Sequence, residues 1–233
     1  MKVLFVGPSL PDAARHVGPE ISLRPPARQG DVMRALADGA TAIGLIDGLF
    51  ENVAPIWHKE ILFALSNGIP VFGAASMGAL RAAECAPFGM IGIGEIFADY
   101  AAGRRVEDAD VALLHGPAEM NYPAVTVPMV NVEATLARAV ALSLLSKAAA
   151  EDLIACARAI FYKERSWRTI IATAAFGWDN FSPILQAAAV DQKRLDALAL
   201  VQALAQGHSP EMRQKDWIFN ATPLWRTLYG VDA

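Results

Sequence analysis

Short apolar runs alternate with amphipathic stretches along the first half of the chain. Three runs are almost wholly apolar, have the length of buried strands, and end at turn residues or small side chains: residues 3–6, 41–46 and 69–72. Helical patterns lie between them, the clearest at residues 32–37 and 55–66. This alternation of strand and helix predicts a parallel sheet covered by helices on both faces, a Rossmann- or flavodoxin-like α/β fold.

Two more segments extend this predicted layer. Residues 91–102 are expected to carry a helix that begins near Gly94 and Glu95, and the apolar run 111–114 is predicted as a fourth strand. Residues 15–29 are rich in proline and arginine and have little periodicity, so they are predicted as a surface loop.

The pattern becomes helical throughout after residue 123. Predicted helices span residues 128–149, 151–161, 166–175, 183–188, 192–206 and 211–227. We therefore expect an α/β core domain over residues 1–128, followed by a helical C-terminal region over residues 129–233.

Composition narrows the class of protein. With 233 residues, 54% of them hydrophobic, the chain can bury a substantial core, and its net charge of −4 argues against a nucleic-acid footprint. Neither a signal-peptide pattern nor an uninterrupted run of 18 apolar residues occurs, so we expect a cytoplasmic protein without a membrane segment. Cys85 and Cys156 are far apart and the histidines are scattered, which predicts free thiols and no metal site.

Residues that can bind or react follow each predicted strand. Because the carboxyl ends of parallel strands meet at one edge of a sheet, and ligands bind there, we expect these residues to converge. They are Gly7 and Pro8 after the first strand, Asp47 after the second, Ser76, Met77 and Gly78 after the third, and His115 after the fourth.

The segment around Ser76 carries the most information. A turn of small residues leads to Ser76, which stands at the expected N-cap of a helix. The free N–H groups of a helix N-terminus suit an anion or a developing oxyanion, so Ser76 could cap the helix, bind an anion or act as a nucleophile. Spacing alone favours the cap, because only half of the G-x-S-x-G elbow is present, with Ala74 in place of the first glycine.

The sequence signals for a catalytic base and for the acid that would orient it are less specific than the signal at Ser76. His58 and His115 could each act as a base, because the unperturbed pKa of a histidine side chain is near neutral. Asp47 is either a turn residue or a carboxylate that orients a histidine, and Glu60 and Glu119 are close in sequence to His58 and His115 respectively.

Arg81 and Glu84 are three residues apart on one predicted helix. Their spacing predicts an ion pair, and the alternative is that Arg81 holds a carboxylate.

Taken together, the motif segments resemble the TfuA-like family over roughly residues 3–136. The matching segments are residues 5–8 (FVGP), 25–26 (PP), 29–31 (QGD), 46–48 (IDG), 57–61 (WHKEI), 71–84 (VFGAASMGALRAAE), 87–92 (PFGMIG) and 115–119 (HGPAE). The resemblance implies a partner of a YcaO-type enzyme in backbone thioamidation of peptides or proteins. It further implies a role in sulfur supply, namely hydrolysis of the thiocarboxylated C-terminus of a ThiS-like carrier protein.

The residues found above can be assigned to such a reaction as hypotheses. Ser76 would be the nucleophile or a substrate contact, and the N–H groups of Met77 and Gly78 would hold the oxyanion. His115 or His58 would be the base, oriented by Asp47 or Glu60, and Arg81 would hold the anionic end of the carrier.

Two alternatives stay open. The protein could be an adaptor without chemistry that docks YcaO with its sulfur donor or peptide substrate, or it could be an ordinary small-molecule hydrolase or nucleotide binder. Neither G-x-G-x-x-G nor a Walker loop is present, so no nucleotide cofactor is expected. The sequence leaves open whether the chain forms a homo-oligomer and which peptide is finally modified.

Overall fold

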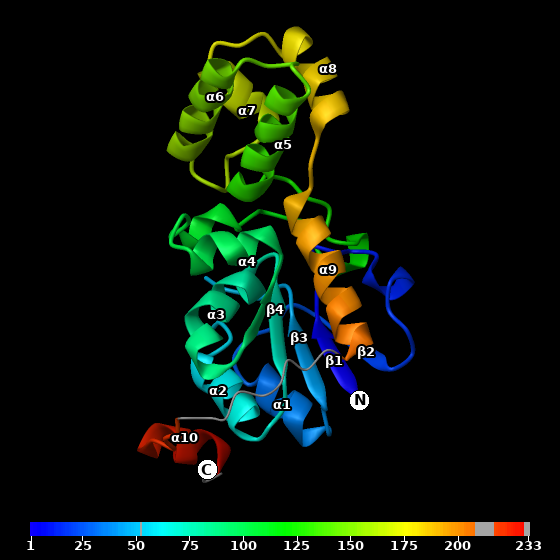
Figure 1. The fold of residues 1–233 in the computed structure, drawn as a ribbon, viewed down its shortest axis with the longest axis vertical. Helices are drawn as coiled ribbons and strands as arrows, with labels where there is room; N and C mark the ends of the chain where they lie inside the picture. The colour runs from blue at the N-terminus through cyan, green and yellow to red at the C-terminus, as the bar shows by residue number, and fades with distance from the viewer. Residues whose placement is uncertain (52, 208–216, 231–233) are drawn as a thin grey trace.

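The sheet is parallel throughout and has five strands. The computed structural model describes residues 1–51, 53–207 and 217–230. The strands are β1 (Lys2–Phe5), β2 (Ile21–Arg24), β3 (Ala42–Leu45), β4 (Val71–Ala74) and β5 (Ile91–Ile93), in the order β2-β1-β3-β4-β5 (Figure 1). The predicted α/β class is confirmed, and the order is the flavodoxin-like one, with its topological switch point between β1 and β3.

Helices cover both faces of the sheet because buried parallel strands point apolar side chains to each side. The helices of this layer are α1 (Asp31–Ala37), α2 (His58–Ser66), α3 (Met77–Cys85), α4 (Gly94–Ala101) and α9 (Gln192–Gln206). Helices α1, α2 and α3 pack on the face that carries Val3, Phe5 and Ile43. Helix α9 packs on the opposite face, against Leu4 and Phe72 (Figure 1).

A second group of helices lies beyond one end of the sheet, at the top of Figure 1. These are α5 (Met129–Ala141), α6 (Lys147–Ala159), α7 (Trp167–Thr173) and α8 (Trp178–Ala188), which share a separate apolar core. After α8 the chain returns to the sheet as α9, so part of the C-terminal half belongs to the α/β layer. The domain boundary after residue 128 stays a prediction.

The last described helix, α10 (Pro223–Tyr229), packs against α1 and α2 rather than against α5–α8. Trp225 is fully buried there and contacts the rings of Trp57 and Phe63. Four short 3₁₀ helices complete the description: η1 (Ala13–Arg15), η2 (Ala86–Phe88), η3 (Asp108–Asp110) and η4 (Ala118–Met120).

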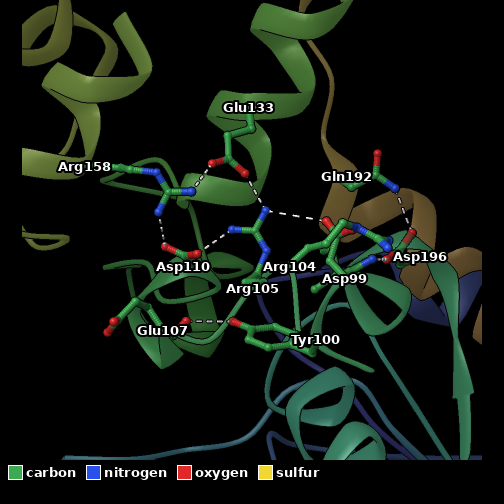
Figure 2. Close-up of polar contacts among 11 residues, drawn as sticks. Asp99, Tyr100, Arg104, Arg105, Glu107, Asp110, Glu133, Arg158, Gln192 and Asp196 are labelled. Atoms are coloured by element: carbon green, nitrogen blue, oxygen red, sulfur yellow. Dashed lines mark hydrogen bonds and ion pairs between the residues drawn. The ribbon is translucent and has the colours of Figure 1, made fainter. Parts of the chain in front are cut away.

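A buried ion-pair network joins the α/β layer to α5 and α6. Figure 2 shows Arg105 at its centre, where the guanidinium donates to Asp110 on η3 and to Glu133 on α5. Arg158 on α6 pairs with the same two carboxylates. Arg105 is the buried cation of this network, so removing it would leave the two acids with only the more exposed Arg158 as a partner.

Several predicted elements are wrong. The apolar run 111–114 forms no strand, although Val111 and Ala112 are buried. The predicted loop 15–29 contains edge strand β2, and strand β5 was not predicted. The predicted helix start near Gly94 is confirmed, because α4 begins there.

Helix boundaries also differ. Helix α2 begins at His58, not at Pro55, and residues 217–222 of the predicted helix 211–227 are not helical. Residues 211–216 of that helix lie outside the described residues.

Candidate active site

Asp47 ties together the two strands at the switch point. It follows β3, is 3% exposed, and accepts hydrogen bonds from the backbone N–H groups of Gly7 (2.8 Å) and Ser9 (3.0 Å) and from the Ser9 hydroxyl (2.6 Å). These three bonds fix the loop after β1, in which Pro8 is half-buried. Asp47 is therefore at the predicted edge, but it orients this loop and not a histidine.

Two glycines let α3 start directly against the sheet. A Cβ atom added to Gly78 would lie 1.8 Å from the Leu45 carbonyl oxygen, and one added to Gly73 would lie 2.1 Å from the Gly78 oxygen. The turn between β4 and α3 is sharp, with Ala75 at a φ of 66°, which is strained for a residue other than glycine. This close approach brings Ser76 to the carboxyl edge beside the end of β3.

Ser76 stands at the N-cap position of α3, but its side chain does not cap the helix. The residue is only 9% exposed, and its hydroxyl has no hydrogen-bond partner among the described residues. The capping interpretation is therefore wrong. A nearly buried hydroxyl without a protein partner is available to a ligand.

The two amides proposed for an oxyanion differ. The Gly78 N–H donates to the carbonyl oxygen of Ile46 (3.1 Å), so it is not free. The Met77 N–H has no acceptor within the described part of the chain, and it belongs to the residue after Ser76. That is the position from which a nucleophile elbow supplies its oxyanion donor.

Glu84 holds two other predicted site residues. Its carboxylate accepts from His58 Nε2 and from Arg81, each at 2.7 Å, and Arg81 also donates to the Ile56 carbonyl. Burial acts to raise the pKa of Glu84, but these two hydrogen bonds outweigh it and leave the pKa below its ordinary value. The predicted Arg81–Glu84 ion pair is confirmed, and no hydrogen bond joins His58 to Ser76.

His115 lies on a hairpin, not at the end of a strand. Its Nδ1 atom is 2.7 Å from the Gly116 carbonyl, and its ring packs edge-on against Tyr122, with ring centroids 5.5 Å apart. Tyr122 in turn lies next to Gly7, which places the hairpin over the carboxyl end of β1. Glu119, at the exposed tip, makes no hydrogen bond to His115.

A pocket of about 340 Å³ opens beside this hairpin. Its lining includes Gly7 and Leu10 from the loop after β1, Pro25 after β2, and Tyr122. It adjoins the loop that Asp47 fixes, so the edge of the sheet offers space for a ligand as well as polar groups.

Glu60 has a structural role in place of the predicted orienting one. Its fully buried carboxylate accepts from the Gly30 N–H at the start of α1 (2.7 Å) and from the Tyr229 hydroxyl (3.1 Å). Burial raises the pKa of Glu60 despite these bonds. Glu60 thus fastens α1 and α10 to α2.

Lys193 is the residue at this edge that sequence reasoning missed. It lies at the start of α9, is 3% exposed, and donates from Nζ to the Val111 carbonyl (2.8 Å). Burial lowers its pKa, while the negative charges of Asp47 and Asp191 act in the opposite direction. Its place in an apolar stripe with Ala197 and Leu200 could have revealed a buried lysine.

Three further findings concern metals, membranes and thiols. Within the described residues no three His, Cys, Asp or Glu side chains are grouped to hold a metal ion, and no helix could cross a membrane. Cys85 is buried, which raises its pKa to about 12, as expected for an inert core thiol.

The fold and the edge site define a doubly wound α/β protein with candidate reactive groups around its switch point. The family model described as TfuA-like protein matches residues 47–166, slightly more than half of the chain, and the chain belongs to the TfuA-like family. The matched range includes Asp47, Ser76 and His115 but ends before Lys193. No curated protein matches the chain. Family membership supports a role in the YcaO-associated thioamidation system.

Proposed function

We propose that this TfuA-like protein releases sulfide from the C-terminal thiocarboxylate of a ThiS-like carrier protein and delivers it to a YcaO-type enzyme. Family membership supports the pathway. The observation that carries the chemistry is the nearly buried, unpartnered hydroxyl of Ser76 beside the free N–H of Met77. A nucleophile and an oxyanion donor at adjacent positions suit attack on an acyl–sulfur carbon.

The reaction balances with water as the only other reactant. Ser76 Oγ attacks the thiocarboxylate carbon, the Met77 N–H stabilises the oxyanion, and the carbon–sulfur bond breaks. The serine proton leaves with the sulfur as HS⁻, so the thiocarboxylate sulfur itself is the proton acceptor of this step. Water then hydrolyses the serine ester to a carboxylate and a proton, which regenerates the hydroxyl.

The base for the second step is assigned to His115. His58 is paired with Glu84, whereas the His115 ring packs against Tyr122, which lies next to Gly7 and lines the pocket. A neutral imidazole can take the proton of the attacking water.

The test is sulfide release from a thiocarboxylated ThiS-like carrier by the purified protein. Ser76→Ala should lose release by a factor of about 10² or more, because the nucleophile is gone, and should keep its stability, because Ser76 caps nothing. Ser146→Ala is the matched control: Ser146 does cap α6, accepting from the Ala149 N–H at 3.2 Å. That variant should lose about 1 kcal/mol of stability and keep its activity.

Full sulfide release by Ser76→Ala would remove Ser76 from the mechanism. No release by the wild-type protein, combined with stimulation of YcaO when both are present, would instead indicate an adaptor.

A further inference from the structure

The position of Lys193 follows from the face of α9 that covers the sheet. Ala197, Leu200 and Leu204 on that face belong to one core cluster with Ala75, the residue before Ser76. Lys193 precedes Ala197 by one helical turn on the same face. Since α9 runs antiparallel to the strands, with Leu204 at Lys2, its first turn lies at their carboxyl ends (Figure 1). Lys193 therefore lies at the edge where Asp47 and Ser76 are found.

The charge of Lys193 has no carboxylate in contact with it. Its one hydrogen-bond acceptor among the described residues is the neutral carbonyl of Val111. The acidic side chains nearby are bonded elsewhere. Asp47 accepts from Gly7 and Ser9, and Asp191 accepts from Asn131 and the Arg194 N–H.

Asp196, on the same helix, accepts from the N–H of Ile96 in the first turn of α4. It also accepts from Gln192 (Figure 2). A buried ammonium group with one neutral partner is costly, and the cost falls when an anion binds.

We propose that Lys193, the Ser76 hydroxyl and the Met77 N–H form an anion site that takes the carboxylate or thiocarboxylate end of a protein chain. The three groups are hydrogen-bond donors with unused capacity at one edge of the sheet. Arg81, which the sequence suggested for this task, is engaged by Glu84 and Ile56. The identity of the chain end rests on the proposed function, because substrate and product of that reaction both end in an anion.

The site is tested by calorimetric binding of the carrier in two unreactive forms, one ending in a carboxylate and one in a carboxamide. The wild-type protein should bind the carboxylate form at least about tenfold more tightly, as expected for a charge-assisted contact in a buried site. Lys193→Met, which replaces the ammonium group by an uncharged, unbranched side chain one atom shorter, should bind both forms equally. Lys147→Met, at an exposed lysine of α6, should behave as the wild type.

Three results would overturn the site: equal binding of both forms by the wild type, no binding of either form, or a preference retained by Lys193→Met. Lys193→Gln is measured in parallel, and urea unfolding of each variant confirms that the compared proteins are folded.

The outcomes separate this inference from the proposed function. Lys193-dependent carboxylate binding without sulfide release would refute the hydrolase and keep the anion site. Sulfide release with equal binding of the two carrier forms would refute the anion site alone.

Discussion

Gly78 offers a test of the contact that seats α3 on the sheet. Replacing glycine by alanine inside a helix normally stabilises a protein by about 1 kcal/mol, because glycine has the lower helix propensity. At Gly78 the new Cβ would lie 1.8 Å from the Leu45 carbonyl oxygen and 2.5 Å from the carbonyl carbon. Backbone atoms of a central strand cannot rotate away, so we expect the sign of the effect to reverse.

The expected size follows from three contributions. Moving α3 outward weakens the hydrogen bond from the Gly78 N–H to the Ile46 oxygen, which costs about 1 kcal/mol. Overpacking of a tight interior costs about 1–3 kcal/mol more. After the gain of about 1 kcal/mol in helix propensity, Gly78→Ala should lose about 1–3 kcal/mol of unfolding free energy.

Equilibrium unfolding in urea measures this loss of unfolding free energy. Ala83→Gly on the same helix is the control, because it changes helix propensity without adding a Cβ atom against the sheet. Ala83→Gly should destabilise by about 1 kcal/mol or less. If propensity alone governed α3, the two substitutions would have opposite signs. A Gly78→Ala protein as stable as the wild type, or more stable, would refute the close packing described above.

Three further substitutions test other parts of the structure. Burial raises the pKa of Glu60, so the wild-type protein loses stability as the pH rises and this carboxyl group ionises. The urea midpoint of Glu60→Gln should therefore increase relative to that of the wild type between about pH 4 and pH 8. A difference in midpoint that stays constant over this range would contradict the prediction. Arg105→Met leaves Asp110 and Glu133 without their buried cation and should lower the unfolding free energy by about 3–5 kcal/mol. The control Arg104→Met, at an exposed pair with Asp99, should lower it by less than about 1 kcal/mol. Equal losses in the two variants would disprove the central place of Arg105. Trp225→Ala should lower the unfolding free energy by about 3–5 kcal/mol. It should also speed amide hydrogen exchange in α10 while α9 stays protected. A uniform loss of protection would speak against a separate α10 cluster.

The central strands were predictable because they are apolar on both faces, as buried parallel strands must be. The edge strands were not. Strand β2 lies between prolines and only Ile21 of its four residues is buried, and β5 has three residues, so neither forms a long apolar run. The run 111–114 shows the converse error: apolar residues mark burial, but Val111 is buried among α3, α4 and α5, which leaves the same pattern as burial in a sheet.

Convergence of Asp47 and Ser76 at one edge was predictable from the handedness of the crossovers. Their partners were not, because hydrogen bonds between distant segments leave no local signal. Glu60 looked like the neighbour of a candidate base, yet its carboxylate binds α1 and Tyr229. Lys193 comes from a helix without any motif, more than a hundred residues after Ser76.

Helix α9 covers one face of the sheet, yet it is synthesised after α5–α8. During translation all five strands exist before the helix that covers the face carrying Leu4 and Phe72. Until α9 has been made, that apolar face stays open to water and to other chains, which favours aggregation or chaperone binding. A chain that ends at residue 128 would retain the strands but lack this cover. The sheet and the candidate site can therefore be completed only late in synthesis, when Lys193 has joined them.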